Sequence, residues 1–439
     1  MTTSRNNPGR PSRRRFIAGS AAALTAGMIG APAVRAQSAK TLRFLNNETS
    51  ADSMRALKIA AAEYEKASGV KVVIDSVTTE ATFTKLSTSI RSGQPYDIAG
   101  LQFPSQVMLL AGQGHLVPLD GLTSKYQWGP DLSMSMNGKT YYYPYDYNFS
   151  WVYYRKDLYA SKGLSVPATW DQLLANSQAL TGDGVSGSLF PIGANPAANW
   201  LSTGFLWADG VTLFDDQWNV TLDAAASKAR TARYLDFMAA LYKTMPPGAS
   251  QASFSEVISN FVSGKVAHAP YAGRIIETLD RNAPNLADKF GIMPFVDSAG
   301  KTKAVCNATD GWVVLKSEHS EEALKFMEWF TENHYINFLH TAPLHFQPAR
   351  LDVYDDPRWK SNPLIRKYAD VVQQMRTFAT DPDIIRASID TQGPAPDLRP
   401  GKVFESFAVP EMLENRCLKN LPAEQCVQIA ADKIRKLIA

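Results

Sequence analysis

From residue 41 onward, short apolar segments alternate with amphipathic ones, and this alternation allows few folds. Residues 41–45, 70–74 and 96–101 have the composition of strands buried in a sheet. The segments between them carry apolar residues at helical spacing and end near Gly69 and Gly93, where glycine favours helix termination. Strands that alternate with helices indicate βαβ units around a mainly parallel sheet, so we predict an α/β fold.

In such sheets, ligands bind at the carboxyl ends of the strands. The loops that follow the three expected strands are residues 46–50, 78–82 and 102–105. These loops contain amide, hydroxyl and carboxyl side chains, which can bind a small polar ligand. The sequence therefore predicts a binding site at this edge of the sheet.

The first 36 residues have the pattern of an export signal. SRRRF at 12–16 precedes a weakly apolar stretch rich in Ala and Gly, and Val34-Arg35-Ala36 forms a small-residue cleavage site. The paired arginines are similar to a twin-arginine signal. The apolar stretch is too short to span a bilayer, so we expect a soluble periplasmic protein from which residues 1–36 are removed.

The charge and cysteine content exclude several classes. Residues 1–36 contain six arginines and no acidic residue, so the remainder has 39 basic and 42 acidic side chains. This mildly acidic body argues against a nucleic-acid partner. Three cysteines exclude a disulfide-dense scaffold. Cys417 and Cys426 flank a turn marked by Asn420 and Pro422, and in an oxidising compartment we expect them to form a disulfide.

Two further motifs are not expected to carry chemistry. GDGVSG at 182–187 has the glycine spacing of a dinucleotide-binding loop but follows a helical segment, whereas that site requires a preceding strand. His334, His340 and His345 do not have the spacing of a zinc site. We therefore predict no cofactor, no metal and no catalytic residue.

Several segments, in order, resemble one family, the periplasmic solute-binding proteins of carbohydrate ABC importers. This is extracellular solute-binding protein family 1, the maltose-binding-protein-like group. The motif PATWDQL at 167–173 is similar to the family's Pro-x-Thr-Trp-Asp-Glu-Leu. The other similar segments are residues 94–98, 114–120, 138–144, 153–158, 261–267, 311–317 and 321–326. The resemblance spans residues 41–345 and extends less clearly into the tail.

The resemblance implies a two-lobed periplasmic-binding-protein (Venus flytrap) fold with a ligand cleft between discontinuous lobes. Lobe 1 would comprise residues 37–145 and about 311–350, and lobe 2 residues 146–310 and about 351–439. It also implies capture of a mono- or disaccharide or small glycoside for the permease of an ABC importer, by a monomer. The ligand-binding positions that it implies are Asn47, Glu48, Thr49, Thr79, Glu80, Gln102, Ser105, Tyr145, Tyr147, Asn148, Asn195, Trp200, Tyr271, Gly273, Arg274, Asp310, Gly311, Trp312 and Arg399.

The chemistry of these residues suits a sugar. Amide, carboxyl and guanidinium groups pair with hydroxyls, and tyrosine or tryptophan rings pack on the apolar face of a sugar ring. Leu101 and Pro104 stand where maltose-binding members have Trp and Asp, which favours a smaller or different glycoside. Arg274 and Arg399 could meet an anionic substituent, so an acidic or sulfonated sugar stays open.

Two other functions stay open at this point. A periplasmic glycoside hydrolase would use two carboxyl groups, for which Asp310 and Glu48 are the candidates. A binding protein for a polyamine or a metal chelate would need several acids or a Tyr/His/acid cluster in the cleft. The mixed Asn, Gln and Arg set argues against a polyamine.

Overall fold

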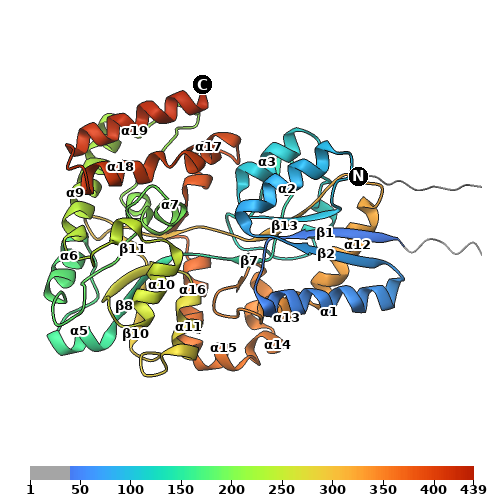
Figure 1. Cartoon of the computed structure of the whole chain (residues 1–439), viewed down its shortest axis with the longest axis horizontal. Helices are drawn as coiled ribbons and strands as arrows, with labels where there is room; N and C mark the ends of the chain where they lie inside the picture. Colours follow the sequence, from blue (N-terminus) through green and yellow to red (C-terminus); the bar gives the residue numbers. More distant parts are fainter. Residues whose placement is uncertain (1–39) are drawn as a thin grey trace, which may run out of the picture. The chain divides into compact units, whose positions relative to one another are not determined.

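The computed structural model describes residues 40–439, apart from the side chain of Glu80. The described residues belong to one compact unit, and within it they fold into two lobes (Figure 1). Each lobe has a sheet at its centre and helices around it. The expected signal segment, residues 1–36, lies outside the described residues.

The first lobe is built on a five-stranded sheet of order β2-β1-β3-β13-β6. Its strands are β1 (Thr41–Asn46), β2 (Lys71–Ser76), β3 (Ile98–Leu101), β6 (Tyr143–Pro144) and β13 (Gly311–Val314). β1 pairs in parallel with β2 and β3, as the βαβ alternation predicts, whereas β13 is antiparallel to both β3 and β6. A segment from late in the chain thus completes a sheet begun by the first residues.

Helices cover this sheet because their apolar residues lie on one face. α1 is held at its start by Ser50, whose hydroxyl accepts the backbone N–H of Ser53, and ends at Gly69 in the left-handed conformation. Leu57 and Tyr64 are buried on its inner face. The helices of this lobe are α1 (Ala51–Ser68), α2 (Thr79–Arg91), α3 (Pro104–Gly112), α4 (Asp120–Thr123), α12 (Ser320–Asn333) and α13 (Tyr335–Leu339), with a hairpin of β4 (Ser135–Met136) and β5 (Lys139–Thr140).

The second lobe contains two three-stranded sheets, in the orders β10-β8-β9 and β11-β12-β15. Their strands are β8 (Trp151–Arg155), β9 (His268–Tyr271), β10 (Phe290–Met293), β11 (Phe295–Val296), β12 (Lys303–Cys306) and β15 (Ile384–Ala387). The other helices are α5 (Lys156–Lys162), α6 (Trp170–Ala179), α7 (Pro196–Leu201), α8 (Gly204–Ala208), α9 (Ala225–Tyr242), α10 (Phe254–Val262), α11 (Arg274–Asn282), α14 (Pro357–Lys360), α15 (Pro363–Lys367), α16 (Ala369–Thr380), α17 (Leu398–Ser406), α18 (Ala408–Cys417) and α19 (Ala423–Ile438), with 3-10 turns η1 (Ala249–Gln251), η2 (Leu351–Asp355) and η3 (Ile389–Thr391).

The segments that pass between the lobes lie side by side. The backbone N–H of Asn148 donates to Ala308 O at 2.9 Å, and that of Tyr145 donates to Asp310 O at 2.8 Å. A third segment joins them through the pairing of β14 (Gln347–Pro348) with β7 (Asp146–Tyr147). Because these crossing segments are held to one another, side chains that project from them have fixed positions at the base of the space between the lobes.

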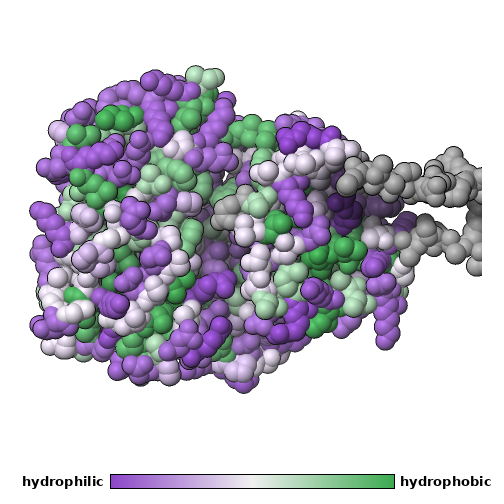
Figure 2. All heavy atoms as spheres, viewed as in Figure 1, coloured by the Kyte–Doolittle hydropathy of each residue, from purple (hydrophilic) through white to green (hydrophobic). Residues whose placement is uncertain are grey.

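Most side chains on the face shown in Figure 2 are polar, and apolar ones are scattered among them. The large apolar residues lie inside instead, as Trp151, Trp207, Trp312 and Trp359 show by being almost fully buried. Within residues 40–439, no helix combines the length and the apolar character needed to cross a membrane.

Candidate functional site

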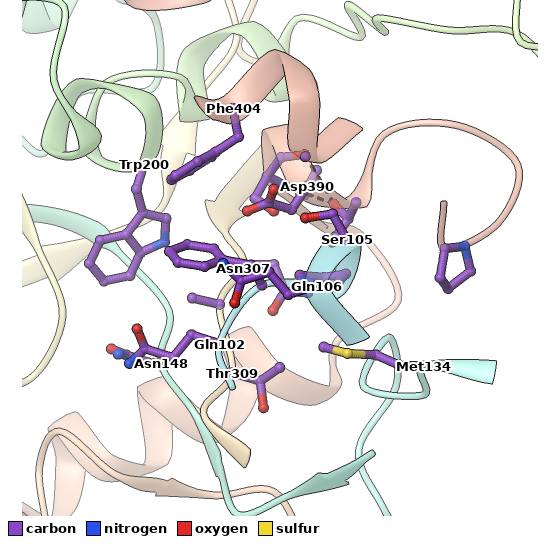
Figure 3. Close-up of a pocket in the computed structure, with 18 of the residues that line it drawn as sticks. Gln102, Ser105, Gln106, Met134, Asn148, Trp200, Asn307, Thr309, Asp390 and Phe404 are labelled. Carbon is purple, nitrogen blue, oxygen red and sulfur yellow. Dashed lines mark hydrogen bonds between the residues drawn. The ribbon is translucent and has the colours of Figure 1, made fainter. Parts of the chain in front are cut away.

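A cavity of about 830 Å³ lies between the two lobes (Figure 3). Its wall combines loops of the first lobe, the crossing segments, helices of the second lobe and the C-terminal strap, the name used here for residues 386–407. The polar and aromatic lining residues include Thr79, Gln102, Phe103, Ser105, Gln106, Asp131, Asn148, Trp200, Phe254, Tyr271, Asn307, Thr309, Asp310, His345, Arg386, Ser388, Asp390, Thr391, Phe404, Glu405 and Phe407. These segments are far apart in sequence, so only the folded chain forms the site.

The wall of the first lobe begins where β3 ends. Gln102 follows the last residue of the strand, and Pro104 starts α3 at a position where its missing N–H is not needed. Ser105 then lies in the first turn of the helix, next to the cavity. Thr79, at the start of α2, also reaches the cavity. The carboxyl edge of the sheet thus faces the space, which is the position expected for a ligand in an α/β fold.

Five buried polar atoms around the cavity have no hydrogen-bond partner in the described part of the chain. They are Asn148 Oδ1, Trp200 Nε1, Asn307 Oδ1, His345 Nδ1 and Asp390 Oδ1. Buried polar atoms are nearly always paired, because an unpaired one costs about 1–3 kcal/mol. The set includes amide and carboxyl acceptors as well as an indole donor, and hydroxyl groups, which both donate and accept, match each of these kinds of atom.

Aromatic rings form the apolar part of the wall. In the second lobe, Trp200 lies 6.1 Å from the ring of Phe254 and 6.1 Å from that of Tyr271, in edge-to-face contacts. The rings of Phe103, from the first lobe, and Phe404, from the strap, are 5.1 Å apart. Rings fixed in this way offer apolar faces beside the polar atoms, a combination that suits a molecule with both hydroxyl and C–H surfaces.

Two carboxyl groups are buried at the base of the cavity. The backbone N–H of Asp310 donates to Asp146 Oδ1 at 2.7 Å, and Asn148 Nδ2 donates to Asp310 Oδ2 at 3.5 Å. Burial, followed by the nearby charge of Glu48, raises the pKa of Asp310, and burial likewise raises that of Asp146. Burial and the charge of Arg274 lower the pKa of His345, so its imidazole is neutral near pH 7.

A third buried carboxyl, Asp390, lies in the C-terminal strap. Burial, with a smaller contribution from the charge of Glu405, raises the pKa of Asp390 to about 8. In the unfolded chain the pKa returns to about 4. Folding therefore favours the protonated form, and this contribution to stability is present at low pH and is lost as the pH rises from about 4 to about 8.

This shift predicts a pH-dependent effect of Asp390→Asn. We expect the stability of the ligand-free variant relative to the parent to rise by about 4 kcal/mol from pH 5 to pH 8.5, because the amide cannot ionise. Thermal melts from pH 5 to pH 8.5 measure this, with the exposed Asp216→Asn as the matched control. Parallel melting curves for Asp390→Asn and its parent would contradict the shift.

The C-terminal strap contacts the first lobe directly. α17 packs on α3 so closely that a Cβ atom added at Gly401 would overlap the side chain of Ser105 (Figure 1). Arg386 Nε donates to Asp131 Oδ2 at 2.8 Å across the same gap. Together with the contact between Phe103 and Phe404, these interactions join the lobes beside the cavity.

This geometry agrees with the comparison to known families. The sequence model of the family described as bacterial extracellular solute-binding protein matches residues 47–335, about two thirds of the chain. The chain is a bacterial extracellular solute-binding protein. This confirms the family resemblance in the segments quoted above.

Curated relatives of this solute-binding protein cover part of its length. The mannitol-binding protein of Pseudomonas aeruginosa is 29% identical over 251 residues, which are 52% of this chain and 55% of that protein. The osmoprotective compounds-binding protein GgtB of Synechocystis is 30% identical over 191 residues, 40% of this chain and 44% of that protein. The chain thus matches about half the length of each.

Solved structures match over a larger part of the chain. A solute-binding protein of Thermotoga lettingae bound to α-D-tagatose superposes with a TM-score of 0.73 and 20% identity, covering 91% of this chain and all of that one. One from Agrobacterium vitis with bound D-mannitol gives a TM-score of 0.67 and 21% identity, covering 91% and 98%. At these identities the likeness establishes the fold, so the two-lobed Venus flytrap prediction is confirmed.

The structure brings part of the implied ligand set to the cavity. The residues that line it are Thr79, Gln102, Ser105, Asn148, Trp200, Tyr271 and Asp310. Asn195 lies nearby and has a positioning role: its side chain accepts the Ala198 N–H at 3.1 Å and so caps α7, the helix that carries Trp200. Gly273 packs directly against the backbone of Leu344, where a Cβ would not fit, and so brings the start of α11 beside the cavity wall.

Other residues of the implied set lie in the core instead, which corrects their expected exposure. Tyr145 packs against Trp312, whose side chain is fully buried, and the Tyr147 hydroxyl donates to the carbonyl of Pro130. Strand alternation places both tyrosines on one face, but α13 and the loop at Phe346 cover that face with apolar residues. Gly311 is also buried, since Tyr142 and the backbone of β6 leave no room for a side chain there.

The remaining implied residues have other partners. Asn47 is buried against Gly100, Thr49 is exposed, and the Glu48 carboxylate accepts the Ser50 N–H at 2.9 Å. Arg274 starts α11 outside the cavity wall, although its charge lowers the pKa of Asp310. Arg399 pairs with Asp397 at 3.4 Å and lies over the ring of Trp218 at 4.6 Å, so it does not meet the cavity. Glu80 lies in α2, and the expectation for its side chain falls outside the described part.

Sequence reasoning missed four prominent lining residues. Asn307 directly follows β12. His345 is one of three histidines whose spacing in the sequence excludes a zinc site and gives no sign of a ligand contact. Asp390 and Phe404 lie in the strap, on either side of a proline-rich stretch, residues 394–400, without regular periodicity. The one available signal was the change from strand to polar loop at Asn307, which resembles the end of β3.

The cysteines differ from expectation, and two of the three histidines have partners away from the cavity. Cys417 and Cys426 are both free thiols, so the expected disulfide is not present in the structure. Cys426 instead contacts Leu421 O through its thiol at 3.8 Å. Among residues 40–439, no three His, Cys, Asp or Glu side chains form a metal-binding group. His334 pairs with Glu63, and His340 stacks on Trp359.

Proposed function

We propose that this protein captures a small carbohydrate, a sugar or its polyol, in the cavity between its lobes and delivers it to the permease of an ABC importer. The observation that carries the proposal is the set of five unpaired buried polar atoms beside aromatic rings. Sugars and polyols have hydroxyl groups that donate and accept, together with C–H faces that pack on rings. The named ligands of the relatives, mannitol and α-D-tagatose among them, belong to this class.

The capture mechanism follows from the two-lobed fold. A ligand that contacts both lobes favours the closed arrangement because it makes more interactions there, and the permease can then recognise the closed form. Trp200 and Tyr271 would contact the ligand from one lobe, and Gln102 and Ser105 from the other. No residue needs to perform chemistry in this process, and we propose that the protein is not an enzyme.

The proposal includes the finer expectations about export and organisation. Residues 1–36 are a twin-arginine signal peptide that is removed, and the mature protein is a periplasmic monomer. Lobe 1 comprises residues 37–145 and about 311–350, and lobe 2 comprises 146–310 and about 351–439. The path of the crossing segments supports the changes of lobe near residues 145–150 and 307–310.

A thermal-shift panel of monosaccharides, disaccharides and polyols tests the proposal. A ligand that binds only the folded state raises the melting temperature by an amount that grows with RT ln(1 + [L]/Kd). We expect a clear rise with at least one panel member, and we expect that compound to be recovered intact by chromatography. A hydrolysed product would favour a glycosidase, and a response to polyamines alone would exclude the carbohydrate class.

A further inference from the structure

Asp390 occupies a distinctive position in the cavity wall. It lies in η3, on the C-terminal strap, and only 8% of its surface is exposed. Its Oδ1 atom is buried without a partner in the described chain, and the residue faces the cavity in Figure 3. A carboxyl group that is nine-tenths buried and unpaired needs a hydrogen-bonding partner from elsewhere.

The backbone around Asp390 does not depend on this side chain. Ser388 and Thr391 cap the turn reciprocally, with the Ser388 N–H donating to Thr391 Oγ1 at 2.9 Å. Gln392, the residue after the turn, is held in place because its side-chain oxygen accepts the Leu213 N–H at 3.2 Å. The strap therefore holds its shape through its neighbours, and the Asp390 carboxyl remains available to the cavity.

No free cation surrounds Asp390 among the described residues that line the cavity. Arg386 is the one arginine or lysine in that lining, and it already binds Asp131, Asp381 O and Ile384 O. The charge that acts on the Asp390 carboxyl is that of another acid, Glu405.

A second cation, Arg274, starts α11 outside the cavity wall. Its positive charge acts on the carboxyl groups of Asp146, Asp310 and Glu277, whereas the charge that acts on Asp390 is that of Glu405. Beside Asp390, the one arginine of the described lining is thus already bound to other groups. A ligand that brought a further negative charge next to Asp390 would find no free cation in that described lining.

We infer that Asp390 is a specificity residue: its carboxyl accepts a hydrogen bond from a hydroxyl of an uncharged ligand, and its surroundings exclude ligands with a carboxylate or phosphate. This inference rests on the proposed function and narrows its ligand class. An unpaired charge buried in such a site is strongly unfavourable. An anionic ligand would also lie beside Asp390 and Glu405, whereas a hydroxyl donates to either carboxyl oxygen without that cost.

Calorimetric titration with matched pairs of probes tests the inference. The pairs are D-glucose with D-glucuronate, D-galactose with D-galacturonate, and D-mannitol with D-mannonate, each at pH 9, where the Asp390 carboxyl, with its pKa of about 8, is ionised. We expect at least one uncharged member to bind, and to bind at least 100-fold more tightly than its anionic partner. In Asp390→Asn we expect this ratio to fall at least tenfold, because the amide offers an N–H donor to a carboxylate. Asp216→Asn, which changes an exposed residue outside the lining, should leave the ratio unchanged.

The outcomes separate this inference from the proposed function. If an anionic probe binds as tightly as its uncharged partner, or if folded Asp390→Asn and Asp390→Ser both keep the parent's ratio, the inference is wrong and the carbohydrate function stands. If no probe of any of the three pairs binds and the wider sugar panel is also silent, the proposed function fails, and the inference fails with it.

Discussion

Gly401→Ala should weaken ligand binding about tenfold, although alanine is the better helix former. Gly401 lies inside α17, where replacement by alanine normally stabilises a helix by about 1 kcal/mol. Here the new Cβ would overlap Ser105 on α3, and overpacking of this kind costs about 1–3 kcal/mol. Because the contact joins the two lobes, they can relieve the overlap by moving apart, so the cost falls on closure. The measurement is the Kd of the best panel sugar by calorimetry, with small-angle scattering of the ligand-bound form.

Two variants show whether the overlap is responsible. Gly121→Ala introduces the same change in α4, where a Cβ would meet no atom within 4 Å, and should leave the Kd unaltered. Ser105→Gly removes the atoms that the new Cβ would meet, and because Ser105 also lines the cavity, this single variant is the reference for the double variant. We expect Gly401→Ala to cost no further affinity when it is added to Ser105→Gly. If it still weakens binding about tenfold in that background, the steric explanation is wrong.

Trp200→Ala should reduce affinity for the same sugar by about thirtyfold or more, which corresponds to about 2 kcal/mol. The substitution removes the ring that faces the cavity beside Phe254 and Tyr271, and with it the unpaired indole N–H. Trp200→Phe keeps a ring and loses the donor, so its affinity should fall between those of the parent and the alanine variant. Calorimetry at 25 °C measures both.

Trp329→Ala controls for the general effect of losing a tryptophan. Trp329 is half-buried on the first lobe against Tyr64, outside the cavity lining. We expect it to lower the melting temperature and to leave the Kd within about twofold of the parent, since mutations at distant sites act independently. Equal losses of affinity in Trp200→Ala and Trp329→Ala would mean that stability, and not contact with the ligand, determines binding.

The first lobe could be predicted from sequence because its elements follow local rules. Expected strands at 41–45, 70–74 and 96–101 correspond to β1, β2 and β3, and the helical segments expected to end near Gly69 and Gly93 correspond to α1 and α2. Asn137 and Gly138, a pair that favours hairpin turns, join β4 and β5 with φ values of 53° and 74°. Each of these signals lies within about 20 residues of sequence.

The cavity wall was harder to predict because it depends on contacts between distant segments. Alternation along the strand correctly puts Tyr145 and Tyr147 on the same side, but it cannot say whether that side meets solvent or Phe338 and Phe346. The strap has no periodic pattern, and the position of Asp390 depends on the packing of α17 against α3. Tertiary packing, and not local preference, decided both results.

The insertion of β13 into the first sheet has a consequence for synthesis. β3 gains its neighbour on that side from Gly311–Val314, which follow about 210 residues later in the chain. At about 5–20 residues per second, a ribosome needs about 10–40 s to make the intervening segment. During this interval the edge of β3 has no partner strand in the described chain, and an unpaired edge can join other chains. A nascent or truncated chain that ends before Gly311 should therefore need a chaperone to stay in solution.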